Sequence, residues 1–187
     1  TVNLDAGSYA RLVVSLSVTF PGVEVEGDFG FSGDSNTGRK IITANNVRIF
    51  LGDTSGSNKV GLQLINGRAA LIQEGEGDSA IRAGFVEGEV SLVGVSGLSI
   101  SAHMTFRVNQ FTQAVSETFI MGGEVFNIDF TQHEIASNGQ SFMLFQAEDV
   151  GVSTDFVSLS GDMAFSKSAT GITVVGQGIT AALTTGA

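Results

Sequence analysis

The sequence contains no cysteine, no tryptophan and a single proline, and its basic residues are few. Without cysteine there is no disulfide scaffold, no thiolate zinc site and no cysteine nucleophile. Nine Lys and Arg are set against nineteen Asp and Glu, which gives a net charge of −10. A surface of that sign repels phosphate backbones, so we expect no nucleic-acid partner. No uninterrupted apolar run reaches the roughly 18 residues of a membrane span, so none is expected.

Apolar residues alternate with polar or smaller ones along almost the whole chain. Residues 98–108 (LSISAHMTFRV) show the pattern most cleanly, and residues 12–20, 47–51, 60–64 and 125–130 repeat it. A period of two predicts half-buried β-strands, because successive side chains leave opposite faces of a strand. Gly, Asn, Asp and Ser cluster at 32–38, 52–58, 74–79 and 137–140, as hairpin turns require. We therefore predict an all-β chain of ten to twelve strands without a long helix.

Two segments of the chain match each other. Residues 23–32 (VEVEGDFGFS) and 157–166 (VSLSGDMAFS) align at an offset of 134, and residues 45–52 (NNVRIFLG) and 177–184 (QGITAALT) align at 132. The match runs through a strand, a turn and another strand, which favours an internal repeat over two unrelated hairpins. We expect residues 1–154 to form one repeat unit and residues 155–187 to begin the next, matching 21–52. The chain then holds about 1.4 copies of a ~134-residue unit, and we expect an elongated repeat module, either a β-solenoid-like stack or a two-sheet sandwich.

These strings also carry a resemblance. GDFGFS and GDMAFS, each followed by a Thr-Gly turn and a further strand, resemble the tandem β-repeats of very large bacterial secreted or surface proteins, which are adhesin-like and form fibres. The intervening VGLQLINGRAALIQ and GVSGLSISAHMTFRVN resemble them too. The resemblance implies an extracellular or cell-surface location and a structural role as a fibre, stalk or adhesin repeat. Its partners would be copies of itself or adjacent repeats, joined end to end through strand contacts.

The sequence offers no catalytic constellation. His103 and His133 are the two histidines, and no G-x-S-x-G elbow accompanies them. Carboxylate pairs such as Glu87 and Glu89 are present, but the chain has one tyrosine and no tryptophan on which a sugar ring could stack. We therefore predict that the protein is not an enzyme and assign no catalytic residue.

Calcium is the one ion that the sequence favours. Hard cations bind several oxygen ligands in glycine-rich turns, and acidic or amide side chains gather in three such turns, while two further aspartates occupy matching positions in the repeated segments. The candidate ligands are Asp34 with Asn36, Asp53 with Asn58, Glu74 and Glu76 with Asp78, and separately Asp28 and Asp162. For any single one of them, a solvated turn or an Asx-type hydrogen bond is the favoured explanation. The alternative function is accordingly a calcium-dependent module that recognises a surface glycan or another surface.

Overall fold

The computed structural model describes residues 9–34, 38–54, 58–168 and 171–183, and almost all of them lie in β-strands. Eleven strands and one short 3₁₀ turn make up this part of the chain, so the all-β prediction is confirmed. Its only helical element is the three-residue turn Gly77–Ser79, and no described helix has the length and apolarity needed to cross a bilayer. The strands are β1 Tyr9–Phe20, β2 Val23–Asp34, β3 Arg39–Asp53, β4 Val60–Glu74, β5 Ile81–Val93, β6 Leu98–Asn109, β7 Val115–Met121, β8 Glu124–Phe130, β9 Phe142–Thr154, β10 Val157–Ser168 and β11 Gly171–Leu183.

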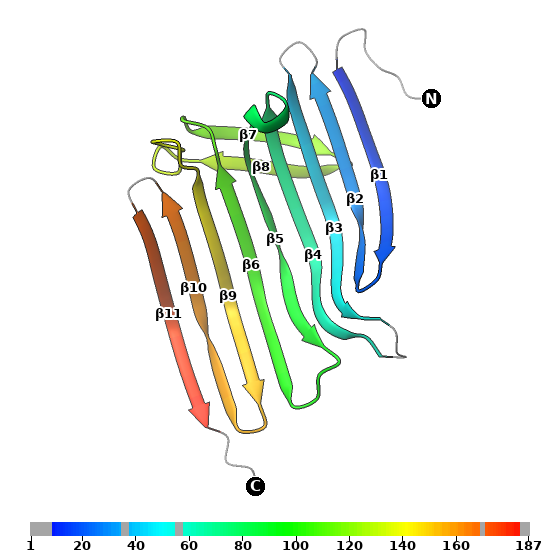
Figure 1. Cartoon of the computed structure of the whole chain (residues 1–187), viewed down its shortest axis with the longest axis vertical. Coiled ribbons are helices and arrows are strands. Elements are labelled where there is room, and N and C mark those ends of the chain that lie inside the picture. The colour runs from blue at the N-terminus through cyan, green and yellow to red at the C-terminus, as the bar shows by residue number, and fades with distance from the viewer. Residues whose placement is uncertain (1–8, 35–37, 55–57, 169–170, 184–187) are drawn as a thin grey trace.

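Nine of the strands form one antiparallel sheet in the order β1-β2-β3-β4-β5-β6-β9-β10-β11, and β7 and β8 form a separate hairpin (Figure 1). Strands that follow each other in sequence pair with each other, except where the hairpin intervenes and β6 pairs with β9. The large sheet does not close on itself, because β1 and β11 lie at opposite edges. The expected boundary at residues 154 and 155 falls in the turn between β9 and β10, inside this continuous sheet.

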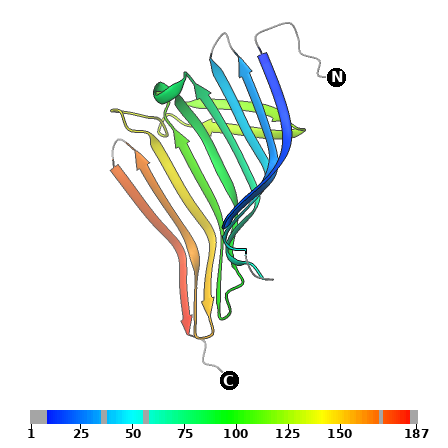
Figure 2. The ribbon, with the colours of Figure 1, turned by 45° about the vertical axis from the view of Figure 1, so that its right-hand side comes forward.

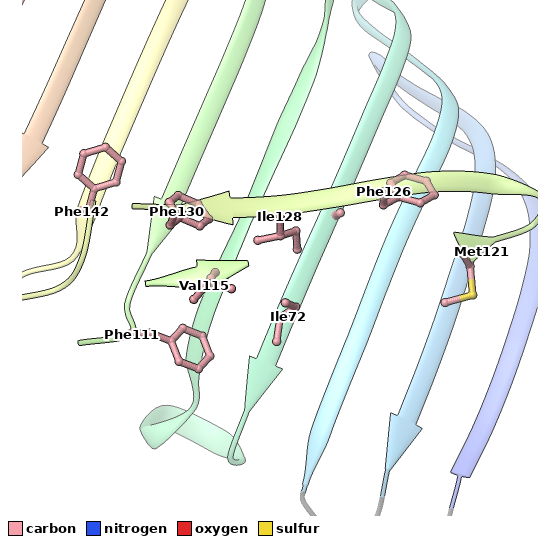
Figure 3. Packing of buried hydrophobic residues seen from close by; sticks show 10 residues of the cluster. Ile72, Phe111, Val115, Met121, Phe126, Ile128, Phe130 and Phe142 are labelled. Atoms are coloured by element: carbon pink, nitrogen blue, oxygen red, sulfur yellow. The ribbon is translucent and has the colours of Figure 1, made fainter. Parts of the chain in front are cut away.

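The β7–β8 hairpin lies across one end of the sheet, with its strands running transverse to those beneath it (Figure 1). It buries an apolar cluster against the sheet, and Phe126, Ile128 and Phe130 of β8 point into this cluster together with Ile72 of β4 (Figure 3). Each of these four side chains is at most 2% exposed. Burial of such large apolar side chains is the main force that holds the hairpin in place.

A line of β-bulges crosses the sheet at one level. The bulges interrupt the register at Asn46 of β3, Asn66 of β4, Asp149 of β9 and Gly178 of β11, and all four residues have a positive φ between 52° and 62°. Asn, Asp and Gly are the residues that tolerate this left-handed conformation. Because a bulge bends its strand and increases the local twist, the line accounts for the bend of the strands part-way along their length (Figure 2).

Candidate functional site

One face of the large sheet, called here the apolar face, is apolar from edge to edge. Directly paired residues of neighbouring antiparallel strands share a face, so the register traces complete rows across the sheet. One row consists of Val14, Phe29, Ala44, Ala69, Val86, Phe106, Phe145, Phe165 and Val174. Another, beyond the bulges, consists of Val18, Val25, Ile49, Leu64, Val90 and Ala102. Val86 and Phe106 in the middle of the first row are 47% and 40% exposed.

The opposite face, called here the hairpin face, is apolar beneath β7–β8 and at Phe50 of β3, which is 3% exposed. Farther along the same strands it is polar, since Glu89, His103 and Glu148 occupy one row of β5, β6 and β9. The next row of that face consists of Ser91, Ser101, Gly151, Ser160 and Thr180. The sheet is therefore amphipathic, and no hairpin formed by the described residues covers its apolar face.

Two arginines of the sheet hold strand β8. The Arg68 guanidinium lies 5.3 Å from the Phe126 ring centroid and donates through Nη2 to the Val125 carbonyl at 2.8 Å. Arg107 lies 4.6 Å from the Phe130 ring centroid and donates to the Asp129 carbonyl, while its Nη1 is 2.7 Å from Glu134 Oε1. A planar guanidinium can stack on a ring and donate several hydrogen bonds at once.

A pocket of about 440 Å³ lies between β8 and the sheet, and Arg68, Glu87 and Arg107 contribute to its walls. Arg68 Nη1 is 3.3 Å from Glu87 Oε1, and both arginines also donate to β8. The charged side chains of this pocket thus hold the hairpin against the sheet, which is a structural role.

Asp28, one of the two matching aspartates, lies beside the bulge of β3. Its carboxylate accepts hydrogen bonds from Ser15 Oγ and from Asn46 Nδ2, the latter at 3.0 Å. The Ser15 hydrogen bond, followed by that from Asn46, lowers the pKa of Asp28 below its ordinary value, and partial desolvation opposes the shift.

Asp162, the matching residue of β10, lies beside the bulge of β9. Its Oδ1 accepts the backbone N–H of Asp149 at 2.9 Å. Glu89 behaves similarly, since its Oε1 accepts from Asn66 Nδ2 at 3.2 Å. At three bulges, therefore, the bulged residue donates to a carboxylate on the neighbouring strand.

The remaining calcium candidates lie in separate parts of the sheet. Asp34 and Asp53 end β2 and β3, Glu74 ends β4, and Glu76 and Asp78 lie in the turn that follows. Lys40 Nζ approaches Glu76 Oε1 to 3.3 Å, and Asn36 falls outside the described residues. Among the described residues, no three Asp, Glu or His side chains gather in an arrangement able to bind a metal ion. Calcium binding stays a prediction from the sequence.

The two histidines lie on different elements of the fold. His103 lies on the hairpin face of β6, paired with Glu89 and Glu148, and His133 lies in the exposed turn after β8. The expectation that the protein is not an enzyme stays a prediction.

The strand triplets β1–β2–β3 and β9–β10–β11 pair in corresponding registers. Every β2–β3 pair has a counterpart in β10–β11, 134 residues later for β2 and 132 residues later for β3. The β1–β2 pairs have counterparts 134 residues later in β9–β10 only as far as Leu16–Gly27, because β9 carries a bulge at Asp149 and β1 carries none. The corresponding pairs are Leu16–Gly27 and Val150–Gly161, Val18–Val25 and Val152–Leu159, Glu26–Arg48 and Ser160–Thr180, and Asp28–Asn45 and Asp162–Gln177. In both triplets the register then shifts at a bulge, Asn46 in β3 and Gly178 in β11. The matching strings of the sequence thus occupy corresponding places in the sheet.

Sequence reasoning did not find the arginine anchors or the bulges. The available signals were Asn45-Asn46 and Asn66-Gly67, short turn-forming pairs placed inside otherwise alternating strands, where they indicate bulges. No local sequence pattern identifies Arg68 and Arg107 as anchors, because the residues they contact lie on a hairpin that is distant in sequence.

The described residues thus present two extended sheet faces and two sheet edges, β1 and β11, each of which pairs with a single described strand. The chain matches no protein family, no curated protein and no solved structure.

Proposed function

We propose that the protein is a structural repeat of an extracellular bacterial fibre, stalk or adhesin, and that it extends a β-sheet end to end. The observation that carries this proposal is the register of β2–β3, which recurs in β10–β11 along its whole length, bulge included, and that of β1–β2, which recurs in β9–β10 as far as the bulge of β9. A shared sequence pattern alone would not fix the pairing of three strands. The extracellular location and the bacterial fibre come from the resemblance of the GDFGFS and GDMAFS strings.

The first triplet indicates how the free edge of β11 is paired in a longer chain. The counterpart of β11 is β3, and β3 pairs with β4 along its other edge, from Lys40–Gln73 to Asp53–Val60. An uncovered strand edge presents unpaired N–H and C=O groups that bind another strand. We therefore assign to β11 a partner strand with the alternation of β4, supplied by the next repeat.

Burial supports the same assignment. Thr43 of β3, beneath the hairpin, is 2% exposed, whereas its counterpart Val175 of β11 is 51% exposed. The difference arises because β3 has a strand on each side and a hairpin above it, and β11 has a single neighbour. The next repeat would supply both missing elements.

Such a repeat widens the sheet by six strands, the equivalents of β1 to β6, and adds one hairpin to its face. At about 4.8 Å per strand, each copy lengthens the assembly by about 29 Å across the strands. This arrangement favours a ribbon that grows laterally over a stack of solenoid coils.

A tandem chain tests the proposal. In the in-phase chain, Ala187 is followed by residues 56–187, so that β11 is succeeded by a copy of β4 at the spacing that follows β3. Small-angle scattering should show a particle that is about 29 Å wider across the strands, and thermal unfolding should show a single cooperative melt. A control chain in which Ala187 is followed by residues 90–187 is out of phase and should give two loosely linked bodies or an unfolded extension. Equal behaviour of the two chains would contradict the proposal.

The surface location has its own test. Antibody against the protein should label intact cells of the source organism. Labelling that appears only after the envelope is permeabilised would contradict an extracellular fibre, while leaving the tandem-chain result unaffected.

A further inference from the structure

The apolar face is large enough to form a stable interface by itself. Nine strands spaced about 4.8 Å apart span about 38 Å, and ten residues of about 3.3 Å each extend about 33 Å along the strands. This footprint is about 1,250 Å², whereas a stable protein–protein interface buries about 800 Å² on each partner. Contact over about two thirds of the face would therefore be enough for a stable interface. The bend of the strands can thus keep the remaining third out of contact.

Exposed apolar surface of this extent is rare on a protein that works alone. The side chains that stand exposed on the apolar face come from both halves of the sheet. They include Leu12, Val14, Leu16, Phe31, Leu51, Leu62, Val86, Phe106, Leu159, Met163, Phe165 and Val174. In the row next to the first one, the single charged residue is Lys167, near the end of β10.

The composition favours protein over lipid as the occupant. Surfaces that lie against a bilayer carry belts of Trp and Tyr at its two interfaces, and this chain has no Trp and one Tyr. A net charge of −10 also disfavours contact with anionic headgroups.

The surface shape of the apolar face is suited to packing against a second β-sheet. At the level of the bulges it carries glycines, so that Gly27 lies against Val47, and Gly67 and Gly88 lie against Leu64. Beside this shallow line stands the row that contains Phe29, Phe106, Phe145 and Phe165. Large side chains beside a line of small ones allow two inner faces to interdigitate at the usual spacing of about 10 Å between packed sheets.

We propose that the apolar face docks onto the same face of a second copy of this chain, which completes a two-sheet sandwich. A two-fold axis brings apolar rows onto apolar rows, as a self-complementary interface requires. Lys40, Arg82 and Lys167 are charged residues of this face, and they lie near the ends of their strands, where they stay at the rim of the contact. The contact does not depend on the edge-to-edge growth proposed above, because it uses a face and not an edge. It adds a second sheet to the module.

Site-directed cross-linking tests this contact, and the absence of native cysteine makes single thiols unambiguous. We expect Phe106→Cys and Val86→Cys to give a covalent dimer with a bis-maleimide of about 10 Å reach, the spacing of packed sheets. Ser101→Cys, on the hairpin face of β6, should stay uncross-linked under the same conditions. Cross-linking of Ser101→Cys alone, or of none of the three, overturns the proposal.

Sedimentation equilibrium supplies the second measurement. The unmodified protein should be dimeric at micromolar concentration, and Phe106→Glu should be monomeric, while Ser101→Glu should stay dimeric. Val86→Thr keeps the β-branched shape and should weaken the dimer at least tenfold even if Phe106→Glu fails to fold. A monomeric unmodified protein, or one that floats with neutral phosphatidylcholine vesicles as a monomer, overturns the proposal. Failure of the tandem chain to lengthen would count against the edge proposal alone.

Discussion

Gly30 of β2 and Met121 at the tip of the β7–β8 hairpin meet across the interface between the sheet and the hairpin. A Cβ at position 30 would clash with Cγ of Met121, with Thr43 Oγ1 close on the other side. The absent side chain of Gly30 is what lets the hairpin tip approach the sheet. The corresponding residue of β10 is Ala164, and none of the described residues forms a hairpin over it.

The first prediction is that Gly30→Ala weakens hairpin docking and destabilises the fold by about 1–3 kcal/mol, the usual cost of overpacking. Chemical denaturation would measure the loss. The matched control is Gly33→Ala in the same strand, because a Cβ there meets nothing within 4 Å. Equal stability of the two variants would show that Met121 moves aside without cost.

The second prediction concerns Arg107, whose side chain is mostly buried between the sheet and β8. Arg107→Met keeps the aliphatic stem but removes the ring contact with Phe130, the ion pair with Glu134 and the hydrogen bond to the Asp129 carbonyl. We expect a loss of about 1–3 kcal/mol, measured by denaturation. Arg48→Met, at an exposed position of β3, should change stability by less than about 0.5 kcal/mol. A loss of the same size at Arg48 would contradict a specific role for Arg107.

The third prediction concerns the bulge of β4. Asn66 has a φ of 53°, a conformation that glycine adopts readily and β-branched residues avoid. Asn66→Gly should therefore keep the melting temperature within a few degrees, whereas Asn66→Val should destabilise the protein by about 1–3 kcal/mol. If the two variants melt together, the bulge does not constrain the fold as described.

The fourth prediction concerns pH. Since the hydrogen bonds from Ser15 and Asn46 lower the pKa of Asp28 in the folded state, the stabilisation is present above the unfolded pKa of about 4. It is lost as the pH falls through the lowered pKa. The melting temperature of the unmodified protein should thus exceed that of Asp28→Asn at pH 7, and the gap should close once the pH has fallen below the lowered pKa. Asp78→Asn, in an exposed turn, should show no such gap at either pH.

The fifth prediction tests calcium. If the acidic turns bind this ion, millimolar calcium should raise the melting temperature and EDTA should reverse the rise. Glu76→Gln with Asp78→Asn should then reduce the effect more than Asp28→Asn, because Asp28 already accepts two hydrogen bonds. An unchanged melting temperature would remove calcium from consideration.

The alternation of residues such as Leu98, Ile100 and Ala102 determined by itself that this chain forms strands, since a period of two places successive side chains on opposite faces. The matching GDFGFS and GDMAFS strings likewise indicated strands in corresponding places. The alternation is a local pattern and the matching strings are a repeat, so both can be recognised in the sequence alone.

Only the tertiary structure decided what covers each face. Phe126 and Phe106 look alike in sequence, each an apolar residue in an alternating strand, yet Phe126 is 1% exposed beneath the hairpin and Phe106 is 40% exposed on the apolar face. The pairing of β6 with β9 and the arginine contacts to β8 were equally out of reach of the sequence pattern. A period of two divides a strand into two faces, but burial depends on which distant segment packs against each face, and that is a property of the folded chain.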